Sequence, residues 1–252
     1  MKKVLSILLA VCLLAGPSAL LAHAAATETD AQAEDGVTMT SIADVAKFIL
    51  EPHRWGEIQI TPAVLSGADG ARDVYLVALR GTGFTMKKAN NVVACFLSAF
   101  NITTEYYTMT LEAIYQYVPE GATIVFAGHS LGGMIEQQLS CTEELTAKYE
   151  ILKTVNMGSP YVLADASKRE GPLVRFAEKT DIIPRLSPAV FVNLKAYNDM
   201  TIKDGGYLFD PNSAHNLSYM RVDEWGEYDV LGVLNGGATL TVAYDDVVVL
   251  RA

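Results

Sequence analysis

The sequence has few basic residues, and this shortage narrows what the protein can bind. Its 252 residues contain 19 Lys and Arg against 29 Asp and Glu, which gives a formal net charge of −10 at pH 7. Because nucleic acid binding needs clustered cations that neutralise phosphates, this balance argues against a nucleic acid partner. It also disfavours adsorption to anionic membranes, so any contact with lipid would have to be apolar.

An apolar run long enough to span a membrane is missing even at the N-terminus, where hydrophobic residues gather. There Met1-Lys2-Lys3 precedes an apolar run from Val4 to Leu14, and the small residues Ala22-His23-Ala24-Ala25-Ala26 follow. A membrane anchor would need about 20 apolar residues, more than this run supplies. A secretory signal peptide has this layout, with an A-x-A-type cleavage site. We therefore predict a signal peptide over residues 1–26, a mature protein without an integral membrane segment, and a secreted or periplasmic location.

Cysteine is also scarce. Cys12 lies within the predicted signal peptide, which leaves Cys95 and Cys141. An even pair in an exported protein permits a disulfide, which would tie the two segments together. Two buried thiols that behave as small hydrophobic side chains explain the sequence equally well.

The remaining chain is long enough for one α/β domain with a substantial core. Residues 27–39 begin as a polar, acidic stretch without apolar periodicity, so we expect a disordered leader there and a single domain over residues 40–252. Apolar strand-like runs and amphipathic helical segments alternate, which predicts a mostly parallel central sheet with helices on both faces. The segments 228–234 and 238–244 flank Asn235-Gly236-Gly237 and predict a C-terminal β-hairpin. We expect a further strand over 190–196, a helix over 134–148 and a short helix over 216–222.

One stretch carries the strongest chemical signal. In Ile124 to Gly133, an apolar strand breaks at Gly128-His129-Ser130-Leu131-Gly132, a G-x-S-x-G pattern between a predicted strand and a predicted helix. Such a strand-to-helix turn pushes the serine outward, and the glycines avoid clashes with the neighbouring strand and helix. The backbone N–H of Leu131 would then lie beside the serine oxygen and favour a developing negative charge. The alternative is a glycine-rich turn with a surface serine.

Three motifs in order resemble the class 3, or fungal-type, lipases of the α/β-hydrolase superfamily. They are Arg80-Gly81-Thr82, the Gly128–Gly132 pattern, and the run Thr180-Asp181-Ile182-Ile183-Pro184-Arg185-Leu186, and the resemblance extends over roughly residues 40 to 222. It implies an α/β-hydrolase fold and hydrolysis of carboxylic esters without a metal or organic cofactor. It also implies that Thr82 is the second oxyanion donor beside Leu131. An ordinary turn after a strand is the alternative reading of Gly81-Thr82-Gly83.

A serine nucleophile needs an imidazole base within hydrogen-bond reach. Of the four histidines, His23 leaves with the signal peptide, His53 precedes the sheet, and the side chain of His129 is expected to point away from the site. His215 follows the last core strand in a loop, and the superfamily order of serine, acid and histidine selects it as the base. A surface histidine at the start of a helix is the alternative.

The acid should lie between the serine and the histidine in the chain, where it orients the imidazole. Asp181 directly follows an apolar strand and precedes Ile182-Ile183-Pro184, and it occupies the acid's position in the family's motif, so we select it. The alternative is a turn-forming Asp181 with the true acid at Asp199 or Asp204. The other aspartates considered are Asp165 and Asp210.

The predicted function is a secreted serine esterase, most simply a lipase acting on acylglycerols at a lipid–water interface. A short-chain esterase or phospholipase A1 would show the same Ser130, Asp181 and His215, and a non-catalytic secreted binding protein is the alternative of another class. The segment from Gly83 to Asn101 occupies the place of a lipase lid, although an amphipathic helix packed on the core explains it equally well. Neither the oligomeric state nor the acyl-chain preference follows from the sequence.

Overall fold

The structure is a computed structural model that describes residues 36–51, 56–81, 98–189, 199–208 and 210–251. The predicted signal peptide and the leader up to residue 35 lie outside this part, so both stay predictions. The leader's predicted end is wrong, because residues 37–39 form strand β1 (Val37–Met39). These residues pair antiparallel with residues 240–242 near the other end of the chain, a partner that local sequence does not reveal.

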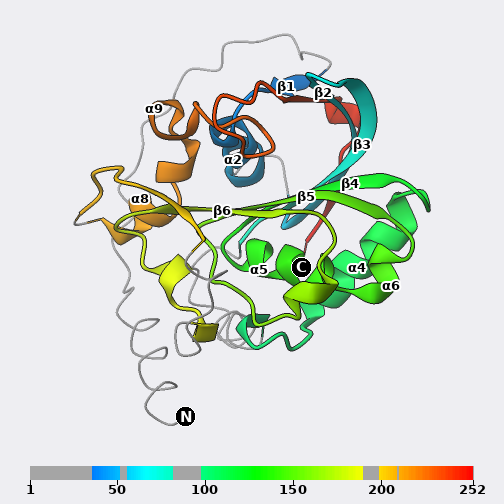
Figure 1. The fold of residues 1–252 in the computed structure, drawn as a ribbon, viewed down its shortest axis with the longest axis horizontal. Coiled ribbons are helices and arrows are strands. Elements are labelled where there is room, and N and C mark those ends of the chain that lie inside the picture. Colours follow the sequence, from blue (N-terminus) through cyan, green and yellow to red (C-terminus); the bar gives the residue numbers. More distant parts are fainter. Residues whose placement is uncertain (1–35, 52–55, 82–97, 190–198, 209, 252) are drawn as a thin grey trace. The chain divides into compact units, whose positions relative to one another are not determined.

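Among the described residues, nine strands form one sheet in the order β1-β8-β2-β3-β4-β5-β6-β7, with β9 also paired to β2 (Figure 1). Strands β3 to β7 run parallel to one another, whereas every pairing that involves β1, β2, β8 or β9 is antiparallel, including that of β2 with β3. The strands other than β1 are β2 (Ile58–Gly67), β3 (Gly70–Leu79), β4 (Thr123–His129), β5 (Glu150–Met157), β6 (Leu173–Glu178), β7 (Thr201–Lys203), β8 (Thr239–Val242) and β9 (Val248–Leu250).

The parallel part of the sheet is the part that carries the function-related motifs. Buried, β-branched runs such as those of β4 and β5 suit strands covered on both faces. The predicted fold class is therefore confirmed: the protein is a mixed α/β structure with a mostly parallel central sheet, consistent with the α/β-hydrolase fold. In such a sheet, ligands bind at the carboxyl ends of the strands.

Helices cover both faces of this sheet, and each face has its own apolar core (Figure 1). Helix α2 (Ile42–Leu50) lies on one face with the short helix α9 (Val222–Trp225), and α4 (Glu105–Tyr117), α5 (Leu131–Leu139) and α6 (Glu143–Thr146) lie on the other. The remaining helical turns are α8 (Pro211–His215), η1 (Ala166–Lys168), η2 (Ile183–Arg185), η4 (Ser218–Met220) and η5 (Tyr244–Asp246).

The predicted helix over residues 134–148 is two shorter helices. Helix α5 begins at Leu131 and ends at Leu139, and α6 begins only at Glu143. Between them the Ser140 hydroxyl donates to the Gln137 carbonyl and the Thr142 hydroxyl to the Gln138 carbonyl. Such side-chain bonds offer the backbone an alternative to a continuous helix.

The C-terminal hairpin takes a different form from the one predicted. Tyr228 and Leu234 make only an isolated bridge with each other, and the following strand β8 enters the sheet between β1 and β2. Strand β9 continues along the same edge of β2. The apolar residues of β8 gain more by pairing with the long strand β2 than by pairing across the turn, because Leu240 and Val242 become buried there.

Three further expectations concern single segments. The short helix expected over 216–222 is only the 3₁₀ turn η4 at Ser218–Met220, and His215 before it is the last residue of α8. The strand expected over 190–196 lies outside the described residues. So does Cys95, and the half-buried Cys141 is a free thiol in the structure, so the disulfide considered between them is not formed.

No helix in the described ranges is long and apolar enough to cross a membrane.

Candidate active site

Ser130 lies on a sharp turn between β4 and α5. Its backbone has φ 55° and ψ −124°, a conformation that costs energy for a residue with a side chain. A Cβ on Gly128 would lie 2.7 Å from the Gly133 backbone, and one on Gly132 would lie 2.2 Å from the Leu79 carbonyl oxygen. Only glycine permits these approaches, so the pattern of glycines around the serine has the steric origin that the sequence suggested.

The structure brings Ser130, His215 and Asp181 into one hydrogen-bonded row. His215 Nε2 is 2.9 Å from Ser130 Oγ, and His215 Nδ1 is 2.9 Å from Asp181 Oδ2. All bonding groups are matched when Nδ1–H donates to the carboxylate and Nε2 accepts the serine hydroxyl proton. Asp181 is 1 % exposed and His215 is 7 % exposed, so water competes little for either bond. The row has the geometry of a nucleophile, a base and an orienting acid.

Asp181 is fixed by two further donors. Tyr219 donates its phenolic O–H to Asp181 Oδ2 at 2.8 Å, and the Ile183 N–H donates to Oδ1 at 3.0 Å. Arg185 donates from Nη1 to the Asp181 carbonyl oxygen at 2.6 Å. The carboxylate therefore accepts three bonds counting that from His215, and its orientation toward the imidazole does not depend on that bond alone.

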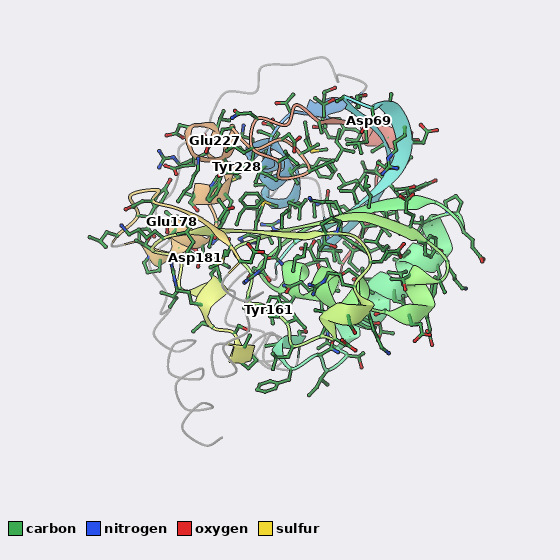
Figure 2. The ribbon with its side chains drawn as sticks, in the orientation of Figure 1. Asp69, Tyr161, Glu178, Asp181, Glu227 and Tyr228 are labelled. Carbon is green, nitrogen blue, oxygen red and sulfur yellow. The ribbon has the colours of Figure 1, made fainter. Side chains whose placement is uncertain are left out.

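Glu178, which the sequence did not single out, holds the turn that carries Asp181. Its Oε2 accepts from the Asp181 N–H at 2.8 Å, the Thr180 N–H at 2.5 Å and the Thr180 hydroxyl at 2.6 Å. Its Oε1 accepts from the Gly205 N–H at 3.0 Å, and the side chain is 1 % exposed. Figure 2 shows Glu178 and Asp181 near each other at the end of β6. This buried carboxylate joins the acid-bearing turn to the loop after β7.

His129 was also missed, because we expected its side chain to point away from the site. Its ring lies 4.6 Å from the ring of His215, and its Nε2 is 2.6 Å from the His215 carbonyl oxygen. Burial, and then the neighbouring His215, hold the pKa of His129 well below its usual range. A neutral imidazole that donates to this carbonyl fixes the backbone of His215.

The predicted oxyanion donors are only partly described. Leu131 begins α5 directly after the serine and is buried. Thr82 lies outside the described residues, but the neighbouring Gly81 is against the serine: a Cβ there would lie 2.5 Å from Ser130 Cβ. Gly81, the last described residue of the Arg80-Gly81-Thr82 motif, therefore lies directly against the nucleophile.

The other candidate residues are not part of this row. Asp204 pairs with Lys179 at 2.7 Å, Asp165 accepts from Ser167, and Asp210 accepts from the Ser213 N–H at the start of α8. Asp199 is exposed, and His53 lies outside the described residues. Apart from Asp181, the described aspartates we considered therefore have local or surface roles.

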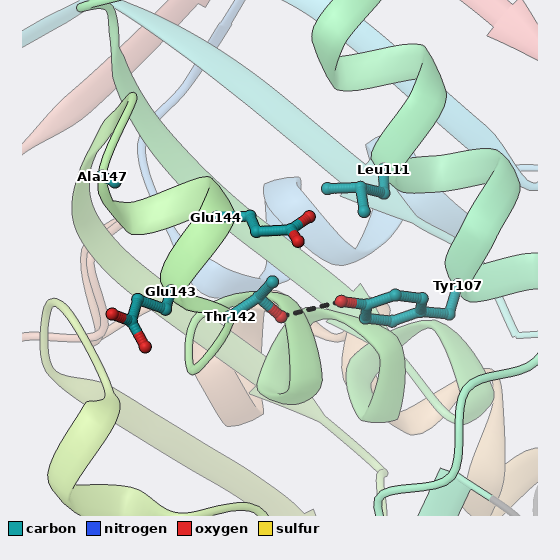
Figure 3. A pocket seen from close by; sticks show the side chains of 6 residues that line it. All are labelled: Tyr107, Leu111, Thr142, Glu143, Glu144 and Ala147. Atoms are coloured by element: carbon teal, nitrogen blue, oxygen red, sulfur yellow. Dashed lines mark hydrogen bonds between the residues drawn. The ribbon is translucent and has the colours of Figure 1, made fainter.

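Two further observations concern ligand binding outside the row. In the described part of the chain, no three His, Cys, Asp or Glu side chains gather as a metal site would require. A shallow groove of about 590 Å³ lies between α4 and α6, where Tyr107 and Thr142 share a 2.8 Å hydrogen bond (Figure 3). Its other lining residues are Leu111, Glu143, Glu144 and Ala147, and it contains no nucleophile–base pair.

A comparison with known protein families identifies the domain that carries this serine. The family model for class 3 lipases matches residues 69–191, which include the serine turn and Asp181. This stretch is a class 3 lipase domain. The predicted family is thereby confirmed. Membership of the class 3 lipase family implies that the protein hydrolyses carboxylic esters. His215 lies beyond the matched residues. No curated protein and no solved structure matches the chain.

Proposed function

We propose that this class 3 lipase is a serine hydrolase that cleaves the carboxylic esters of lipids through Ser130, His215 and Asp181. The observation that carries the proposal is the continuous row of two 2.9 Å contacts from Ser130 through His215 to Asp181. The three residues come from distant parts of the chain: His215 is 34 residues from Asp181 and 85 residues from Ser130. Local folding alone does not account for such an arrangement, which supports a catalytic role.

The reaction begins when Ser130 Oγ attacks the ester carbonyl carbon and its proton passes to His215 Nε2. Asp181 stabilises the resulting imidazolium through Nδ1–H, while the backbone N–H of Leu131 and that of Thr82 hold the negative carbonyl oxygen. The C–O bond to the alcohol then breaks, and His215 returns the proton to the leaving alkoxide oxygen. An acyl group remains on Ser130.

Water completes the cycle by the same steps in the second half. His215 Nε2 takes a proton from water, the hydroxide attacks the acyl carbon, and Ser130 leaves with the proton from His215. The products are a carboxylic acid and an alcohol. The residues need no metal or organic cofactor for these steps.

Apolar side chains exposed next to Asp181 and His215 in the chain, and one in the loop before α8, support a lipid substrate. Ile182 follows Asp181 and is 46 % exposed, and Leu217 lies two residues after His215 and is 47 % exposed. Leu208, in the loop before α8, is 68 % exposed. Exposed apolar side chains at a site suit an acyl chain or a lipid surface. We further propose export after removal of residues 1–26, on the basis of their sequence pattern.

The test is ester hydrolysis by the mature protein across acyl chains from C2 to C16, below and above the solubility limit of each substrate. We expect serine-dependent turnover, with a rate that rises once long-chain substrate forms an interface. If the protein hydrolyses only short-chain esters, and at a rate that does not rise at an interface, it is a short-chain esterase and not a lipase. Equal turnover by Ser130→Ala would contradict the assignment of the nucleophile.

A further inference from the structure

A second carboxyl group is buried directly beneath the serine turn. Glu136 lies on α5, six residues after Ser130, and its side chain is 0 % exposed. One of its oxygens, Oε2, is so close to the turn that a Cβ on Gly128 would lie 2.8 Å away. Neither Oε1 nor Oε2 has a hydrogen-bond partner of good geometry within the described residues. A buried polar group in this state calls for an explanation.

The simplest explanation is that Glu136 carries a proton. Burial raises the pKa of Glu136 well above its ordinary value, and the nearby Asn156 amide and the Arg169 charge only partly oppose this. Among the described residues, the buried Tyr106 phenol of α4 also interacts with it electrostatically. A neutral carboxylic acid supplies an O–H donor, which a carboxylate lacks.

An acceptor for that donor is present on β5. Asn156 is 0 % exposed, and its Oδ1 has no hydrogen-bond partner among the described residues. Its Nδ2 donates to the Gly133 carbonyl oxygen at 2.7 Å. The same carbonyl oxygen accepts from Gln137 Nε2 at 2.9 Å. The Asn156 side chain also lies within hydrogen-bonding reach of the Glu136 carboxyl group, so its amide connects Glu136 with the first turn of α5.

That first turn begins with Leu131, whose N–H is the proposed oxyanion donor. We propose that Glu136, as a neutral acid, donates to Asn156 Oδ1 and is a positioning residue that holds the first turn of α5 under Ser130. This inference rests on the proposed esterase function and deepens it. A donor held in this way keeps its aim at the oxyanion, and misplacement by about 1 Å can cost about a hundredfold in rate.

The experiment compares wild type with Glu136→Gln and Glu136→Leu. Gln keeps a donor of the same shape, whereas Leu keeps the volume and removes the donor. We expect E136Q to retain kcat within about twofold and E136L to lose between about tenfold and a hundredfold in kcat with KM little changed. Glu144→Gln, on the exposed surface of α6, is the control for loss of a carboxyl and should resemble wild type.

Two readouts do not depend on activity. Infrared spectra at neutral pH should show the carbonyl band of a protonated carboxylic acid in wild type and in E144Q, and this band should be missing in E136Q. Hydrogen exchange of the backbone amides from residue 131 to 134 should be faster in E136L but not in E136Q.

The infrared comparison decides the protonation even if E136L fails to fold. Absence of the band from wild type would overturn the proposal, as would an E136L with wild-type kcat and exchange, or an E136Q as impaired as E136L. An inactive wild type would refute the ester hydrolase function, and the spectra and exchange rates would still decide the role of Glu136.

Discussion

Glu178 and Glu136 are both buried beside the candidate active site, but their oxygens have opposite surroundings. Glu178 accepts four hydrogen bonds, three on Oε2 and one on Oε1, and it joins the Asp181 turn to the loop after β7. Glu136 meets no well-placed donor among the described residues, and the Oδ1 of the neighbouring Asn156 also lacks a partner there. The two side chains are equally buried and differ in the number of hydrogen-bond donors around them. A buried carboxylate is stabilised by such donors, so their number matters more here than the depth of burial.

The largest effect is expected from removing the Glu178 carboxylate, which tests whether its hydrogen bonds hold the Asp181 turn. Glu178→Ala leaves the N–H groups of Thr180 and Gly205 without their acceptor, and it leaves the Asp181 N–H only the carbonyl oxygen of residue 178, at 3.2 Å. Because each unsatisfied buried donor costs about 1–3 kcal/mol, we expect the free energy of unfolding to fall by about 3 kcal/mol or more. Urea unfolding measures this, with Glu144→Ala on the exposed surface as the control. A variant as stable as wild type would show that these bonds do not hold the turn.

The next effect concerns pH and comes from Glu136. Its folded-state pKa lies above the ordinary value of 4.5, so the folded protein keeps a proton that the unfolded chain loses. Stability from this group is complete below pH 4.5 and is lost as pH rises toward the folded pKa. Relative to wild type, Glu136→Gln should therefore gain about 1.4 kcal/mol of unfolding free energy for each pH unit in that window.

Urea unfolding at pH 4, 6 and 8 checks this prediction. Wild type and E136Q should be similar at pH 4 and separate as pH rises, while Glu144→Gln should keep a nearly constant difference from wild type. A constant difference for E136Q as well would mean that the buried carboxyl is ionised in the folded protein.

The smallest effect comes from removing one donor of a carboxylate that has several. Tyr219→Phe deletes the O–H that reaches Asp181 Oδ2, together with the oxygen that accepts from the Glu178 N–H at 3.0 Å, and leaves the bonds from His215 and Ile183 in place. A single such bond contributes about 1 kcal/mol, so we expect kcat/KM for a short p-nitrophenyl ester to fall about fivefold. Tyr228→Phe, in the same aromatic cluster, is the control. A loss of several hundredfold would mean that Tyr219 does more than share in orienting Asp181.

The sequence was sufficient where the signal is local. The glycines around Ser130, the strand before them and the Asp181 turn after β6 each have a short-range steric or periodic cause, and the structure places Ser130, Asp181 and His215 together. The capped helix at Ser41 was predictable for the same reason, since Ser41 accepts from the Asp44 N–H.

The sequence was insufficient where the partner is distant. Residues 37–39 look like leader until β8 is placed beside them, and residues 239–242 look like half of a hairpin until β2 is placed beside them. Glu178, Glu136 and His129 are ordinary polar residues in the chain, and only the packing shows which of them finds donors. His215 could be selected by order and elimination, but its place at the end of α8 could not.

The central claim is that Ser130 is the nucleophile and that His215 activates it. The most direct measurement is covalent labelling of the mature protein with a fluorophosphonate, followed by mass spectrometry of the modified peptide. We expect one label per chain on Ser130, none on Ser130→Ala, and labelling at least about a thousandfold slower in His215→Ala because the hydroxyl then lacks its base. A folded wild-type protein that stays unlabelled, or a label on another residue, would contradict the account.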